Sequence, residues 1–133
     1  MNKYIIIFIS TLFIAQLWAD KTDDSSRSSS TIDILYETVD LIGGFQFVLD
    51  GVTLLSASGG AAGAAGFVVS TGGSMVLGFS FTGGTIPAGS GVLIQLEVEG
   101  NPDDACVLDD QNLVFSDPVG NGIDMEVVEC LSI

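Results

Sequence analysis

Residues 43–51 read GGFQFVLDG, and residues 77–84 read LGFSFTGG. Each segment places two phenylalanines two positions apart and then reaches a glycine. Aromatic residues at every second position are typical of a strand with one buried face. A buried Phe side chain contributes roughly 1.5–3 kcal/mol to stability. We therefore predict that these four side chains belong to the core of a β-sheet protein and not to a ligand site: Phe45, Phe47, Phe79 and Phe81.

The same period of two recurs along most of the chain. It predicts strands near residues 32–36, 45–49, 52–57, 67–70, 75–81, 92–98, 113–115 and 123–127. Residues 56–67, SASGGAAGAAGF, mix alanine with glycine and predict a compact loop with room for one helical turn. The strands are separated by turn-forming pairs: Asp50-Gly51, Gly72-Gly73, Gly83-Gly84, Asn101-Pro102 and Asn121-Gly122. Six to nine short strands without a long helical period predict an all-β fold, an antiparallel β-sandwich.

The N-terminal part of the chain has the composition of a targeting segment. Residues 1–19 combine Lys3, an apolar run from Tyr4 to Ile14 and a small residue, Ala19, as in a signal peptide. The run is short of the ~20 apolar residues that a membrane span needs; a retained N-terminal anchor is the alternative. Residues 20–30, DKTDDSSRSSS, predict a disordered Ser/Asp-rich linker, and residues 31–133 predict one domain. We expect a secreted, extracellular protein without a membrane span after signal cleavage.

Charge and residue types exclude several classes of function. The chain has 17 acidic and 3 basic residues, a net charge of −14, so nucleic acid and anionic membranes are excluded as partners. It has no histidine, which excludes Ser-His-Asp and Cys-His catalytic sites. The sequence also lacks the G-x-S-x-G, P-loop and H-E-x-x-H motifs. A glycosidase needs two carboxylates across a cleft, which a small sandwich rarely forms. The sequence therefore predicts a protein that is not an enzyme.

Cysteine pairing and metal binding are the remaining chemical possibilities. Cys106 and Cys130 are the two cysteines, and in an exported chain they predict one disulfide. Two acidic segments, residues 101–112 and 116–124, offer the oxygen ligands that Ca²⁺ prefers. In the second segment the candidate ligands are Asp117, Asn121 and Asp124. Neither segment has the spacing of an EF-hand, and solvated turns are the alternative interpretation.

Three segments resemble the cohesin-like β-sandwich modules of secreted and surface proteins. They are GGFQFVLDGVTLLSASGG (residues 43–60), AAGFVVSTGGSMVLGFSFTGGTIPAGSGVLIQLEVEG (residues 64–100) and LVFSDPVGNGIDMEV (residues 113–127). The Gly-Phe-x-Phe strand and the run TIPAGSGVL carry most of the likeness. The resemblance implies a nine-stranded jelly roll that binds calcium-loaded dockerin modules through one sheet face. Related sandwiches bind carbohydrate.

These observations together predict a secreted, non-catalytic binding or adhesion module. Its partner would be a protein or an extracellular glycan, recognised through a sheet face, a sheet edge or loops. The predicted binding face consists of the residues that alternate with the core positions: Gln46, Val48, Val76, Ser80 and Thr82. One alternative is a structural subunit of a matrix, filament or coat. A second is a carbohydrate-binding module, although Tyr36 is the single tyrosine after the signal segment and no tryptophan follows it.

Overall fold

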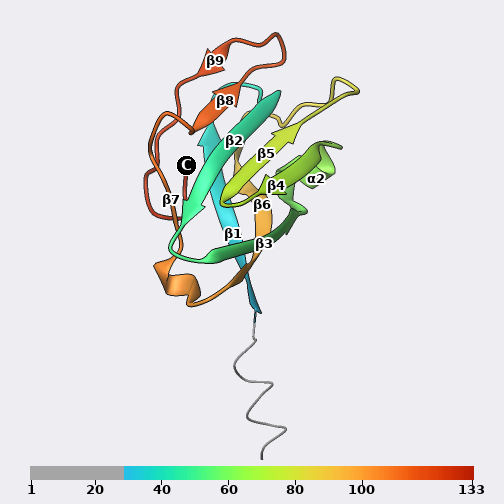
Figure 1. Cartoon of the computed structure of the whole chain (residues 1–133). Helices are drawn as coiled ribbons and strands as arrows, with labels where there is room; N and C mark the ends of the chain where they lie inside the picture. Colours follow the sequence, from blue (N-terminus) through green and yellow to red (C-terminus); the bar gives the residue numbers. More distant parts are fainter. Residues whose placement is uncertain (1–28) are drawn as a thin grey trace, which may run out of the picture.

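The computed structural model describes residues 29–133, which form two packed antiparallel sheets (Figure 1). This confirms the predicted all-β sandwich of about nine strands, while the jelly-roll order implied by the resemblance stays a prediction. The elements in this range are β1 (Ser29–Thr38), β2 (Gly44–Asp50), β3 (Thr53–Ser58), α2 (Gly60–Ala64), β4 (Val68–Gly72), β5 (Met75–Phe79), β6 (Gly89–Glu99), the 3-10 helix η1 (Pro102–Asp104), β7 (Cys106–Val107), β8 (Val114–Ser116) and β9 (Gly122–Ile123).

The folded region begins slightly earlier than predicted. β1 starts at Ser29, so the last two residues of the predicted linker belong to the first strand. The predicted signal peptide and the rest of the linker lie outside the described residues. Between residues 29 and 133, no helix combines the length and the apolar character needed to cross a membrane.

The smaller sheet has the strand order β1-β6-β3. β1 buries every second residue from Ile32 to Thr38, as its alternation predicts. The free edge of β1 is covered by the C-terminal segment, residues 131–133. Leu35 N donates to Leu131 O (2.8 Å), and Ile133 N donates to Leu35 O (2.9 Å). Because the Ile133 side chain is also buried, the chain end closes this side of the sandwich.

The larger sheet has the order β4-β5-β2-β8-β9, and β7 pairs with the end of β2. β2 buries Phe45, Phe47 and Leu49, as predicted. The Phe45 ring lies at the centre of an aromatic cluster, with ring centroids at 6.1 Å to Phe47, 6.1 Å to Phe67 and 5.8 Å to Phe115. These four rings form one aromatic cluster within the buried core.

The facing of β5 is opposite to the prediction. Its register with β2 places Gly78 opposite Phe45 and Val76 opposite Phe47, and opposite residues of an antiparallel pair share a face. Val76 is therefore fully buried, while Leu77 points outward and is 38% exposed. A Cβ atom at Gly78 would lie 2.5 Å from two ring carbons of Phe45. Gly78 faces the core because the Phe45 ring occupies the volume that a side chain would need.

Two other segments match the prediction to different degrees. The helical turn anticipated within residues 56–67 is α2, which joins β3 to β4. The strand predicted for residues 123–127 is reduced to β9, which ends at Ile123. Met125 and Val127 still pack against the core, so their alternation reflects burial without strand pairing.

Candidate binding face

The solvent-facing side of the larger sheet is apolar across four strands. The register aligns Ser70, Leu77, Gln46 and Val114 in one row across β4, β5, β2 and β8. Leu77 is 38% exposed and Val114 is 44% exposed. We call this surface the outer face, and it consists of Gly44, Gln46, Val48, Val68, Ser70, Gly72, Met75, Leu77, Phe79, Val114 and Ser116. None of these residues carries a charge, and Asp50 at the end of β2 is the charged residue that lies on the same side of this sheet.

The structure separates the five predicted binding residues into three groups. Gln46 and Val48 lie on the outer face and are partly exposed. Val76 was predicted to face outward, which is wrong, because it lies in the core opposite Phe47. Ser80 and Thr82 follow β5 in a loop. Ser80 Oγ accepts hydrogen bonds from Thr82 N (3.2 Å) and Gly84 N (2.8 Å), so this side chain organises the loop.

Two phenylalanines predicted as core residues lie at the margin of the outer face. Phe79 is only partly buried, and Phe81 is 79% exposed in the loop after β5. The core prediction is wrong for Phe81 because β5 ends at Phe79 and the alternation does not continue. The two rings pack edge to face, with centroids 4.8 Å apart. They extend the apolar surface beyond the end of the strand.

The charges of the domain are segregated. All 3 basic residues and 3 of the 17 acidic residues precede residue 29, so residues 29–133 hold 14 acids and no base. Residues 51–96, which include β3, α2, β4, β5 and most of β6, contain no charged residue. The solvent side of the smaller sheet carries Asp33, Glu37, Glu97 and Glu99, each at an exposed position. The sandwich thus has one acidic face and one largely apolar face, where Asp50 at the end of β2 is the charged strand residue.

The predicted calcium ligands lie around the β8–β9 connection, where Asp117 has a structural role. Asp117 Oδ1 accepts hydrogen bonds from Val119 N (3.0 Å) and Asn121 N (2.8 Å), which closes the turn. Asn121 and Asp124 are exposed. Within residues 29–133, no group of three or more acidic or cysteine side chains is arranged to hold a metal ion. Calcium binding therefore stays a prediction.

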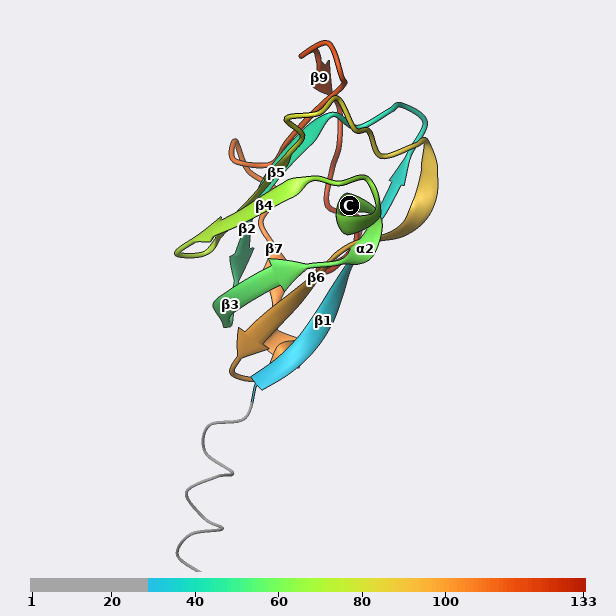
Figure 2. The ribbon, with the colours of Figure 1, turned by 90° about the vertical axis from the view of Figure 1, so that its right-hand side faces the viewer.

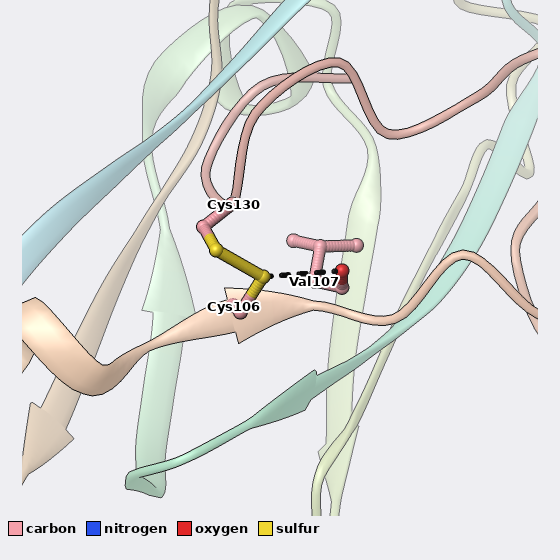
Figure 3. The surroundings of a disulfide bond; sticks show 3 residues. All are labelled: Cys106, Val107 and Cys130. Carbon is pink, nitrogen blue, oxygen red and sulfur yellow. Dashed lines mark hydrogen bonds between the residues drawn. A yellow bond between two sulfur atoms is a disulfide. The ribbon is translucent and has the colours of Figure 1, made fainter.

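The predicted disulfide between Cys106 and Cys130 is present (Figure 3). It joins β7 to the segment that precedes the C-terminal residues. Val107 N donates to Cys130 O (2.8 Å), so a backbone hydrogen bond accompanies the covalent link. The disulfide anchors the start of the C-terminal segment to β7 and has a structural role.

A groove of about 470 Å³ lies between β1, the start of β6 and the C-terminal segment. Its acidic lining residues are Glu37 and Glu129, and Leu35 and Ile133 supply apolar surface. None of the predicted binding or metal residues lines it. The groove does not adjoin the outer face, because its strands belong to the other sheet.

No protein-family model matches this chain, and it has no match among curated proteins or solved structures. The resemblance to cohesin-like modules therefore remains a prediction that depends on the quoted residues.

Sequence reasoning missed most of the outer face. Met75, Leu77, Val68 and Val114 were assigned inward positions or no role. Two signals in the sequence point to this surface. One is Gly78, a glycine within an otherwise apolar strand, which the structure places opposite Phe45. The other is the uncharged stretch of residues 51–96 in an otherwise acidic chain.

Proposed function

We propose that this protein is a secreted, non-catalytic binding or adhesion module that recognises a protein partner through the outer face. The observation that carries the proposal is the outer face itself. It presents apolar side chains from four strands, with Asp50 at its edge as the charged strand residue, although residues 29–133 hold 14 acids and no base. Contiguous exposed apolar surface rimmed by polar residues is typical of protein interaction sites.

The chemistry of the face favours a protein over a glycan. A sugar-binding site needs aligned polar groups or a strip of exposed aromatic rings. On the outer face the aromatic rings are confined to one margin, at Phe79 and Phe81, and its centre offers aliphatic side chains such as Leu77 and Val114. A partner with an apolar centre and a neutral or basic rim would complement the acidic surroundings. A dockerin-like module is the specific partner that the cohesin-like resemblance implies.

A matched pair of variants tests the proposal. Leu77→Lys places a charge at the centre of the outer face, and Asp33→Lys changes the charge of the opposite, acidic face. Immobilised wild-type protein and both variants are exposed to the proteins of the extracellular medium, and the retained proteins are compared. We expect Leu77→Lys to lose a protein that the wild type and Asp33→Lys retain. Equal retention by all three proteins would contradict the proposal, and selective signals on a glycan array would favour carbohydrate binding.

A structural assembly role is the second candidate, and one observation favours it. β4 is an edge strand of the larger sheet and contains no charged residue and no proline. Such an edge can pair with a strand of another molecule. Growth of large species with increasing protein concentration, measured by light scattering, would support a matrix, filament or coat subunit. A calcium-dependent form of either role predicts that a chelator lowers the melting temperature.

A further inference from the structure

The β4 edge differs from the two edges of the smaller sheet, β1 and β3. The outer edge of β1 is bonded to the C-terminal segment, and β3 has a register irregularity between Leu54 and Ser56. Bulges, charges and prolines are the usual devices that prevent edge pairing. β4 has the regular register Val68↔Phe79 to Gly72↔Met75 with β5 and none of these devices. Figure 2 views the side of the sandwich on which β3 and β4 lie next to each other.

The hydrogen-bond pattern identifies which groups of β4 point outward. Leu49 N donates to Ser74 O (2.8 Å), which continues the β2–β5 register, so Ser74 directs its backbone groups toward β2. Backbone groups alternate in direction along an antiparallel strand. Leu77 therefore bonds toward β4, where it pairs with Ser70. It follows that Val69 and Thr71 direct their N–H and C=O groups away from the sheet, and no backbone partner for them exists among residues 29–133.

We propose that β4 pairs antiparallel with β4 of a second copy of this chain, around a twofold axis at Ser70. In this register Val69 lies opposite Thr71 of the second copy, and the two such pairs exchange their N–H and C=O hydrogen bonds. The register is self-complementary because the outward-directed residues meet each other, as an isologous interface requires. Residues on the same face also meet, so the outer faces of both copies join into one surface.

Charge and size favour a second copy at this place. Residues 29–133 of each copy carry 14 acids, so two copies repel one another over most of their surfaces. The region of residues 51–96 has no charge, and β4 lies inside it. The pairing also places Gly72 opposite Val68 of the second copy, a small residue against a branched one. This inference goes beyond the proposed function and does not depend on it, because a dimer forms with or without an external partner.

The test uses charge pairs at Ser70, which is exposed and would lie opposite Ser70 of the second copy. Sedimentation equilibrium of the purified wild type from micromolar to millimolar concentration should show a monomer–dimer equilibrium. Ser70→Lys and Ser70→Glu should each raise the dimer dissociation constant about tenfold, because like charges then face each other. An equimolar mixture of the two variants should regain dimerisation. Ser70→Lys lowers the net negative charge, so general repulsion alone predicts tighter association for this variant.

Two further pairs of variants test the proposal independently. Thr71→Pro removes an outward N–H without touching the β4–β5 ladder and should abolish the dimer, while Thr71→Val should retain it. Ser70→Cys should form an intermolecular disulfide on oxidation, because paired Cα atoms lie about 4.5 Å apart in this register. Gly72→Cys should not, because its two copies would be about 14 Å apart. A wild type that stays monomeric at millimolar concentration, or a Ser70 mixture that remains dissociated, would overturn the proposal.

Discussion

The contact between Phe45 and Gly78 makes a specific prediction about stability. In Gly78→Ala, the new Cβ atom would lie 2.5 Å from the Cε1 and Cζ atoms of Phe45 and 3.1 Å from Cε2. Carbon atoms in protein interiors are separated by about 3.5–4.0 Å at their energy minimum. The ring or the strand must therefore move by roughly 1 Å to accept one methyl group.

The surroundings of the Phe45 ring set the magnitude of the effect. The ring has aromatic neighbours in Phe47, Phe67 and Phe115, with centroids within 6.1 Å. Each of these side chains is itself buried, so movement of the Phe45 ring would displace other core side chains. Inserting a methyl group into a packed core costs about 1–3 kcal/mol. For a domain of this size, that loss corresponds to a decrease of about 5–15 °C in the melting temperature.

Urea denaturation followed by circular dichroism measures the free energy of unfolding of the wild type and four variants. Gly72→Ala is the matched control. Apart from its chain neighbours, no atom lies within 4 Å of the position of the new Cβ atom. We expect this variant to be as stable as the wild type or more stable by about 0.4–1 kcal/mol. Phe45→Leu and the double variant Phe45→Leu/Gly78→Ala complete a cycle with a coupling energy of about 0.5–3 kcal/mol, because the shorter side chain relieves the clash. A Gly78→Ala protein as stable as Gly72→Ala, or strictly additive effects, would refute this account of β5.

Three further predictions follow from other parts of the structure. Replacing both Cys106 and Cys130 by Ala should lower the free energy of unfolding by about 3.5 kcal/mol, the chain-entropy value for a separation of 24 residues. Urea denaturation of the oxidised wild type and the variant measures this difference, and a difference below about 1 kcal/mol would argue against a stabilising role of the disulfide. Val76→Lys should prevent folding because it buries an unpaired charge, whereas Leu77→Lys should change stability by less than about 0.5 kcal/mol; equal melting temperatures for the two would disprove the assigned facing. Deleting residues 131–133 removes the buried Ile133 side chain and the hydrogen bonds to β1, which should lower the free energy of unfolding by about 3–5 kcal/mol. An unchanged melting temperature of the truncated protein would show that the C-terminal segment is dispensable.

The sequence predicted the strands in which polar and apolar residues alternate cleanly. β1 alternates Ile32, Ile34 and Tyr36 with Asp33 and Glu37, so its facing follows directly from the pattern. β2 has the same property. β5 reads MVLGF, in which both faces are apolar, and the period alone cannot decide which face is buried. The decision comes from β2, because only the position opposite Phe45 requires a residue without a side chain.

Long-range pairing was the part that the sequence did not reveal. The bonding of residues 131–133 to β1 joins the two ends of the described region, and nothing in the local pattern LSI indicates a partner. β6 contains a second example. Leu93 and Ile94 are adjacent and both fully buried, because the β1–β6 register shifts there and leaves Leu93 without a pair. Such features depend on where another strand ends, so a local period cannot predict them.

The positions of charged residues help to distinguish apolar side chains that the fold requires from apolar side chains that are available for contact with another molecule. Stability explains why Phe47 and Val76 are apolar, since both are fully buried. It does not explain the apolar side chains at Leu77 and Val114, because polar residues at exposed strand positions would fold equally well and be more soluble. The smaller sheet of the same protein shows this alternative, with carboxylates at the equivalent outward positions of β1 and β6. A chain that places acids on one sheet and none between residues 51 and 96 keeps that region compatible with contact to another molecule.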